Sequence, residues 1–129
     1  MKRLIPLLLA GLLILTGCSI PGAEASGYRQ ITMQEAVDIM SSETGYVILD
    51  VRTAAEYESG HIPGAVNIPN ETIGSSDIPV LPDKDQLILV YCRSGNRSKQ
   101  ASAKLSALGY TRIVEFGGIN AWPGEIVKN

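Results

Sequence analysis

The residues best suited to chemistry lie at positions 92–98, where the sequence reads Cys-Arg-Ser-Gly-Asn-Arg-Ser. The apolar, partly β-branched run Leu87–Tyr91 comes directly before the cysteine, and an alanine-rich stretch follows the loop. This order predicts a strand that ends at Cys92 and a helix that begins beyond it. Amide N–H groups at a helix N-terminus and the positive end of its dipole favour a thiolate over a thiol. We therefore expect Cys92 to have a lowered pKa and to act as a nucleophile.

Strand and helix patterns alternate around this loop. Apolar runs predict strands at residues 46–49, 65–68, 87–91 and 113–116. Two capping-box patterns predict helix starts, at Thr32 with Glu35 and at Thr53 with Glu56, and Gly60 closes the second of these helices. The alternation predicts an α/β fold, with a mostly parallel central sheet and helices on both faces. Ligands bind beyond the carboxyl ends of the strands in such sheets, where Cys92 and Arg52 both fall.

The N-terminus has the pattern of an export signal. Basic residues at Lys2 and Arg3 precede twelve apolar residues, 4–15, too few for a membrane-spanning helix of about 20. The following Leu15–Cys18 stretch resembles a bacterial lipobox, in which the cysteine is lipidated and becomes the first mature residue. We expect a signal peptide at 1–17, a lipidated tether at 18–27 and a folded domain at 28–127. The alternative is an ordinary cleaved signal with an incidental cysteine.

Export has consequences for charge and for the cysteines. Cleavage before Cys18 removes Lys2 and Arg3, so the formal charge falls from −2 to −4 and no basic run remains for binding nucleic acid. With Cys18 lipidated at an extracytoplasmic membrane surface, Cys92 is the only other cysteine of the 129-residue chain. An unpaired cysteine in a compartment that favours disulfides is better interpreted as reactive. A Cys18–Cys92 disulfide is the alternative, and it requires an unlipidated Cys18.

Three motifs together resemble the rhodanese family. The first comprises Asp50-Val51-Arg52, Glu56-Tyr57, Gly60–Ala65 and Asn67-Ile68-Pro69; the second is the loop at 92–98; the third is Gly117-Gly118 followed by Ala121-Trp122. They occur in the family's order and cover nearly the whole predicted domain. The resemblance implies a single-domain sulfurtransferase with a rhodanese-like fold and no cofactor. Cys92 would carry sulfane sulfur as a persulfide, between a thiosulfate, polysulfide or persulfide donor and a thiol or cyanide acceptor.

The length of the loop separates this chemistry from that of related folds. Phosphatases and arsenate reductases on a related fold use Cys-x5-Arg, whereas Arg97 closes a Cys-x4-Arg loop here, with Ser98 next. The shorter ring of amide donors implied by the resemblance suits the outer sulfur of a persulfide better than a phosphate. A phosphatase or arsenate reductase remains an alternative, and so does a module that carries sulfur or binds a partner without turnover.

Within the loop, residues Arg93, Ser94, Gly95, Asn96, Arg97 and Ser98 are expected to surround the persulfide. Arg93 either points outward to attract an anionic donor or is a solvated loop charge. Arg97 is expected to brace the loop by pairing with a carboxylate such as Asp50 or Glu56. Gly95 is expected to supply a positive φ angle.

Supporting residues are expected at Asp50, Arg52 and His61. Arg52 either lines the pocket or only pairs with an acid. His61, the only histidine, is structural in the resembled family, with an acid/base role as the alternative. A single histidine excludes a histidine-based metal cluster, and no zinc-ligand spacing is present, so no metal is expected. The expected partners are small sulfur-containing anions, an acceptor thiol or thiol protein, and the membrane that holds the lipid.

Overall fold

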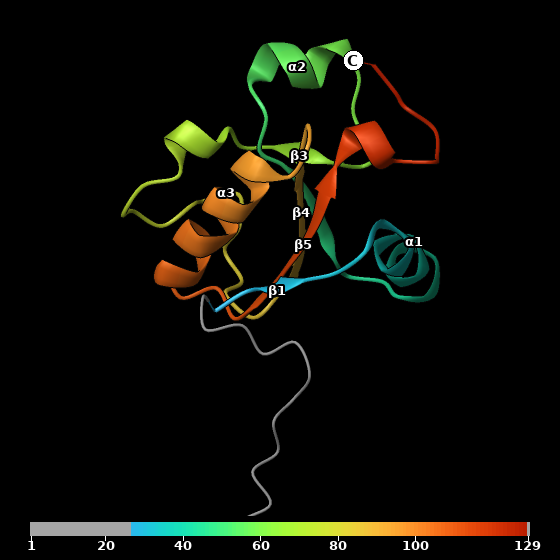
Figure 1. Ribbon diagram of the computed structural model, residues 1–129. Helices are drawn as coiled ribbons and strands as arrows, with labels where there is room; N and C mark the ends of the chain where they lie inside the picture. Colours follow the sequence, from blue (N-terminus) through green and yellow to red (C-terminus); the bar gives the residue numbers. More distant parts are fainter. Residues whose placement is uncertain (1–26, 129) are drawn as a thin grey trace, which may run out of the picture.

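The computed structural model describes residues 27–128, so the predicted signal peptide and Cys18 lie outside the described residues. At its centre is a five-stranded sheet in the order β1-β5-β4-β2-β3, with every neighbouring pair parallel (Figure 1). The strands are β1 (Arg29–Gln30), β2 (Val47–Asp50), β3 (Val66–Asn67), β4 (Leu87–Cys92) and β5 (Arg112–Gly118). All carboxyl ends therefore meet at one edge of the sheet.

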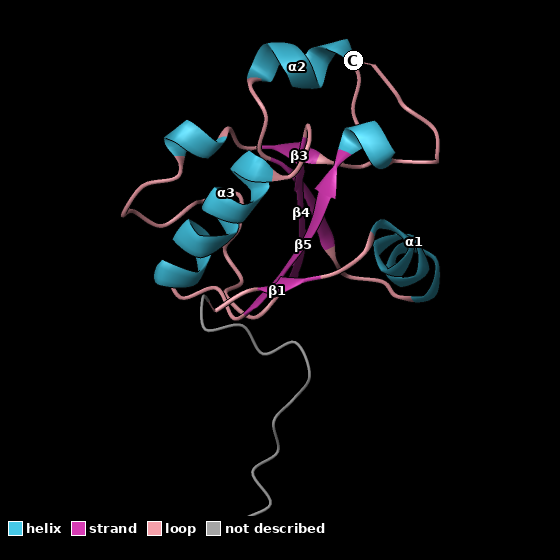
Figure 2. Cartoon of the chain, in the orientation of Figure 1, coloured by secondary structure: helices cyan, strands magenta, loops and turns pink. Residues whose placement is uncertain are grey.

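Helices lie on both faces of the sheet, as the alternation predicted (Figure 2). Helix α1 (Met33–Ser42) covers one face, where Ala36 packs with Ile48, Leu89 and Phe116. Helix α3 (Asn96–Ala107) covers the other face, where Ala101 and Leu105 pack on the sheet. Helix α2 (Ala54–Ser59) lies beyond the carboxyl ends of the strands, and the 3-10 turns η1 (Asn70–Thr72) and η2 (Ile119–Ala121) complete the chain. The fold class predicted from the sequence is confirmed.

Both capping boxes form. The side chains of Thr32 and Thr53 each accept a hydrogen bond from the backbone N–H three residues on, and the glutamate at that position accepts one from the backbone N–H of the threonine. They satisfy N–H groups that a helix start leaves unpaired, which explains why α1 and α2 begin one residue after each threonine.

The strands differ from the sequence predictions in length. β4 and β5 run one or two residues further toward the site, to Cys92 and Gly118, while β3 contracts to two residues at the edge of the sheet. β1 was not predicted, because two exposed residues carry no periodic signal and pair only through the register of β5. Within residues 27–128, no helix has the length and apolarity needed to cross a membrane.

Candidate active site

The sulfur of Cys92 lies at the end of β4, inside a turn of backbone amides. Its residue is 1% exposed, and the N–H of Gly95 donates a hydrogen bond to Sγ at 3.0 Å. Gly95 is the N-cap of α3 with φ +114°, so the predicted positive φ is confirmed. This conformation strains any residue that has a Cβ and turns the amides of the loop toward the sulfur.

These amides govern the acidity of the thiol. Burial raises the pKa of Cys92, but hydrogen bonds from the Ser98 side chain and from the amides of Ser98, Gly95 and Ser94 lower it by more. The net effect is a lowered pKa, as expected for sulfur beside a helix N-terminus.

Gly117 and Gly118 at the end of β5 allow this strand to pack closely against the cysteine loop at 92–98. Gly118 pairs with Cys92 across the sheet, where the register shifts. A Cβ on Gly118 would collide with the carbonyl of Arg93, and the N–H of Asn120 donates to that same oxygen at 3.2 Å. Gly117 adopts φ +94°. The Gly-Gly pair is therefore required by close backbone approach and by backbone conformation.

The second arginine of the loop is tied to α2. Arg97 donates to both carboxylate oxygens of Glu56, at 2.6 and 3.0 Å. The hydrogen bond from Arg97 lowers the pKa of Glu56 to about 2, with bonds from Thr53 assisting and partial burial opposing. Of the two carboxylates expected as partners for Arg97, the structure selects Glu56.

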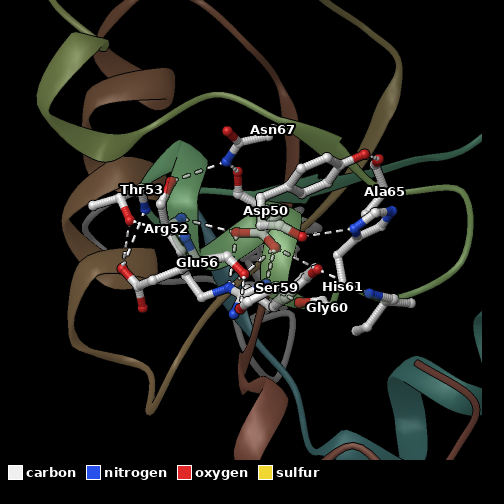
Figure 3. A network of polar contacts seen from close by, with 12 residues as sticks. Asp50, Arg52, Thr53, Glu56, Ser59, Gly60, His61, Ala65 and Asn67 are labelled. Carbon is white, nitrogen blue, oxygen red and sulfur yellow. Dashed lines mark hydrogen bonds and ion pairs between the residues drawn. The ribbon is translucent and has the colours of Figure 1, made fainter. Parts of the chain in front are cut away.

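Asp50 forms its ion pair with Arg52, as Figure 3 shows. Its carboxylate, fully buried, accepts from Arg52 Nη2 at 2.7 Å, from Arg52 Nε at 3.1 Å and from the Tyr91 hydroxyl at 2.7 Å. Arg52 also donates to the carbonyl of Gly60 at 2.7 Å. Burial lowers the pKa of Arg52, but the hydrogen bond and charge of Asp50 raise it by more. Of the two expectations for Arg52, the structure shows the pairing with an acid.

The polar network continues along the first motif, where Asn67 donates to the carbonyls of Asp50 and Arg52 at 3.0 and 2.9 Å. His61 is 4% exposed, its ring lies 3.7 Å from that of Tyr57 in a stacked arrangement, and Nδ1 lies 2.9 Å from the Tyr57 carbonyl oxygen. These contacts give His61 a structural environment.

Two other residues from the motifs take different places. Arg93 is exposed beside Cys92, which is compatible both with attraction of an anionic donor and with a solvated loop charge. Trp122 is half-buried, packs with the core on the α1 face and donates through Nε1 to the carbonyl of Glu125 at 3.0 Å.

Sequence reasoning missed Glu115, which is 3% exposed in the middle of β5. Its Oε1 accepts from the Ser98 hydroxyl at 2.7 Å and from the N–H of Gly117 at 2.9 Å. The available signal was its position in the apolar run of β5, two residues after the buried Ile113 and hence on the same face of the sheet.

Comparison with known proteins agrees with this geometry. Residues 32–125 match the sequence model of the family described as the rhodanese-like domain. The chain is similar to the thiosulfate sulfurtransferase PspE of Escherichia coli K12, with 38% identity over 71 residues that cover 55% of this chain and 68% of that protein. It is also 44% identical, over 79 residues, to a protein named sulfurtransferase from Allochromatium vinosum, covering 59% of this chain and 70% of that one.

A solved structure shows the same architecture. The structure titled "rhodanese with anions from E. coli" superposes with a TM-score of 0.60 at 34% identity and covers 65% of this chain and 99% of that one. The match to the family model spans all three motifs, and the cysteine loop lies between β4 and α3.

Proposed function

The chain belongs to the rhodanese-like domain family and is a sulfurtransferase of the rhodanese type, and we propose that it transfers sulfane sulfur through a persulfide on Cys92. The observation that carries this proposal is the position of Sγ, 3.0 Å from the amide of Gly95 and with a pKa lowered by the surrounding donors. A thiolate at this position is the reactive form of the sulfur.

In the first step the Cys92 thiolate attacks the outer sulfur of a donor such as thiosulfate. A new S–S bond forms, the sulfur–sulfur bond of the donor breaks, and sulfite leaves with the electron pair. In the second step an acceptor thiolate or cyanide attacks the outer sulfur of the persulfide. The Cys92–sulfur bond then breaks and Cys92 leaves as a thiolate, so electrons balance without an added oxidant or reductant.

The persulfide carries negative charge between the two steps, and the loop supplies its stabilisation. The amides of Ser94, Gly95 and Ser98 act on the Cys92 sulfur, and α3 directs the positive end of its dipole toward it. Arg97 adds a positive charge whose position is fixed by Glu56. We propose that Arg93, which is exposed, attracts an anionic donor.

Persulfide formation can be tested by intact-mass measurement of the purified protein after incubation with thiosulfate, followed by an assay of thiocyanate release from thiosulfate and cyanide. We expect the protein to gain one sulfur atom and to turn over, while Cys92→Ser, which retains a similar shape, does neither. A gain of sulfur without turnover would identify a sulfur-carrying module. Failure to gain sulfur, or full activity of the serine variant, would overturn the proposal.

We also propose that Cys18 carries a lipid that holds the domain at an extracytoplasmic membrane surface. The first described residue, Gly27, lies beside the last turn of α3, since a Cβ added at Gly27 would collide with the Ser106 side chain. Because α3 runs back from the carboxyl ends of the strands, the tether would reach the domain at the end opposite Cys92, leaving the site open to soluble substrates. Substitution of Cys18 by alanine should move the protein from the membrane fraction to the soluble fraction; retention in the membrane would argue against lipidation.

A further inference from the structure

A buried carboxylate lies directly behind the cysteine loop and has no ion-pair partner within residues 27–128. Glu115, in the middle of β5, is 3% exposed, and its Oε1 accepts from the Ser98 hydroxyl at 2.7 Å and from the N–H of Gly117 at 2.9 Å. A Cβ placed on Gly95 would lie 3.8 Å from the same oxygen. Burial of a carboxylate is costly, so its place beneath the loop calls for an explanation beyond packing.

Ser98 joins this carboxylate to the sulfur. Its side chain is fully buried, and besides Glu115 it lies 2.9 Å from the carbonyl oxygen of Gly95. The amide of the same glycine lies 3.0 Å from Sγ, which places the Ser98 hydroxyl beside the sulfur, and the Ser98 side chain is among the causes that lower the pKa of Cys92. A serine hydroxyl has a single proton to donate, whereas the carboxylate, the carbonyl and a thiolate can only accept one. The acceptors around Ser98 therefore outnumber its donor.

We propose that Glu115 competes with the sulfur of Cys92 for the hydroxyl proton of Ser98 and thereby sets how readily the sulfur ionises. Glu115 is a positioning residue, since it acts through Ser98. While Cys92 is a thiol, Ser98 donates to Glu115. When Cys92 becomes a thiolate, the hydroxyl turns and donates to the sulfur, at the cost of its short bond to the carboxylate. No covalent bond changes in this rotation.

This arrangement matters for both steps of the proposed transfer, on which this part of the inference rests. The inner sulfur of a persulfide carries little charge, so Ser98 is free to bond Glu115 in that state. The Cys92 thiolate that leaves in the second step accepts the hydrogen bond of the Ser98 hydroxyl. Because Glu115 competes for the hydrogen bond of Ser98, it weakens the stabilisation of the Cys92 thiolate and keeps that thiolate more basic. A more basic thiolate is more nucleophilic toward the next donor, because nucleophilicity falls as thiol pKa falls.

Other charges near this pair are already engaged or point away. From α3, Arg97 acts on the charge of Cys92 but is bound to Glu56, and Lys104 is bound to Asn70.

The remaining charged neighbours among the described residues do not pair with Glu115 or with the Cys92 sulfur. Arg93 of the loop and Arg29 of the adjacent β1 are exposed. Asp50 is neutralised by Arg52. The described part of the chain thus offers Glu115 only the donors of Ser98 and Gly117.

The experiment measures the rate of Cys92 alkylation by iodoacetamide against pH, which reports the thiolate fraction of the bare protein without any sulfur donor. Glu115→Gln has nearly the same shape and keeps an oxygen for the Gly117 amide, but removes the charge that holds the Ser98 proton. We expect the midpoint of the profile to fall by about one pH unit, since a hydrogen bond to a charged group is gained at the sulfur. An unchanged or raised midpoint would overturn the proposal, the latter by showing that Glu115 assists ionisation.

Dependence on the hydroxyl is tested with Ser98→Ala. Alone, this variant should raise the midpoint, and in its presence Glu115→Gln should lower the midpoint by less than half as much as it does beside serine. An equal shift in both backgrounds would reduce the role of Glu115 to a simple charge effect and overturn the competition.

A second variant guards against a folding failure of Glu115→Gln. Glu115→Asp keeps the charge but draws the carboxylate back by one methylene, so Ser98 is released and the midpoint should also fall. A wild-type midpoint in a folded aspartate variant would contradict the proposal. Because no sulfur transfer is measured, failure here leaves the proposed sulfurtransferase reaction to be judged by its own experiment.

Discussion

Asp50→Asn should strongly destabilise the domain while leaving its sulfur chemistry intact. The carboxylate has no exposed surface, and it accepts from the backbone and side chain of Arg52 and from the hydroxyl of Tyr91. Asparagine keeps the shape but loses the charge, so the guanidinium of Arg52, whose side chain is 6% exposed, is left buried without a counterion. Removal of one partner from a buried ion pair costs about 3–5 kcal/mol, a large part of the roughly 5–15 kcal/mol by which small domains are stable.

Urea unfolding followed by circular dichroism measures this loss. With a slope of about 1.5 kcal/mol/M, the midpoint should fall by about 2–3 M. Tyr91→Phe is the matched control, because it keeps the ion pair and removes only the hydroxyl that donates to the same carboxylate and accepts from the N–H of Ile62. It should cost about 2–3 kcal/mol, less than the broken ion pair. The double variant Asp50→Asn with Arg52→Met removes both charges and should be more stable than Asp50→Asn alone.

Two results would refute this reasoning. A loss below about 1 kcal/mol in Asp50→Asn would show that the buried guanidinium is not dependent on the carboxylate. Persulfide formation per folded molecule is measured without urea, at a temperature where the variant is folded. A large loss there would show that Asp50 takes part in the chemistry as well as in the architecture.

Two further predictions concern the braces of the loop. Arg97 lowers the pKa of Glu56 to about 2, so their ion pair stabilises the fold at pH values above the ordinary carboxyl range, and this stabilisation is lost as the pH falls toward 2. Glu56→Gln should therefore lower the free energy of unfolding by about 1 kcal/mol at pH 7 and by almost nothing at pH 2, as measured by thermal unfolding. An equal effect at both pH values would contradict the ion pair. Gly118→Ala should lower the free energy of unfolding by about 1–3 kcal/mol and slow the alkylation of Cys92, because its Cβ would collide with the Arg93 carbonyl. Gly74→Ala is the control, since a Cβ there meets open space, and its stability should lie within about 0.5 kcal/mol of wild type. Similar stabilities for the two variants would contradict the close approach at Gly118.

Local signals in the sequence predicted much of the frame that holds this site. The capping boxes at Thr32 and Thr53 located two helix starts, because the bonds involved join residues only three apart. The apolar run before Cys92 located β4 for a similar reason, since burial on both faces leaves a continuous hydrophobic stretch. Glycine at position 95 predicted the positive φ because a residue with a Cβ is strained there.

Pairings between distant segments were not available from these signals. The sequence offered Arg97 two carboxylates, and only the placement of α2 beyond the sheet brought Glu56 to it across 41 positions. The Tyr91 hydroxyl reaches Asp50 from 41 positions away because parallel pairing sets β2 beside β4, whereas the bonds between Asp50 and Arg52 join residues only two apart. For Arg97 the choice of acid depends on where α2 lies, and that position leaves no local trace in the sequence.

The sequence by itself pointed to Cys92 as the candidate nucleophile and determined the length of its loop and the fold class, since these follow from residue type, short-range spacing and hydrophobic periodicity. Only the tertiary structure decided what lies behind the sulfur. Glu115 reaches Ser98 because β5 lies next to β4 and α3 packs over both, an arrangement produced by burial of the whole core. A charged residue inside an apolar strand signals that it needs a partner, but the partner is chosen by the packing of segments far apart in the chain.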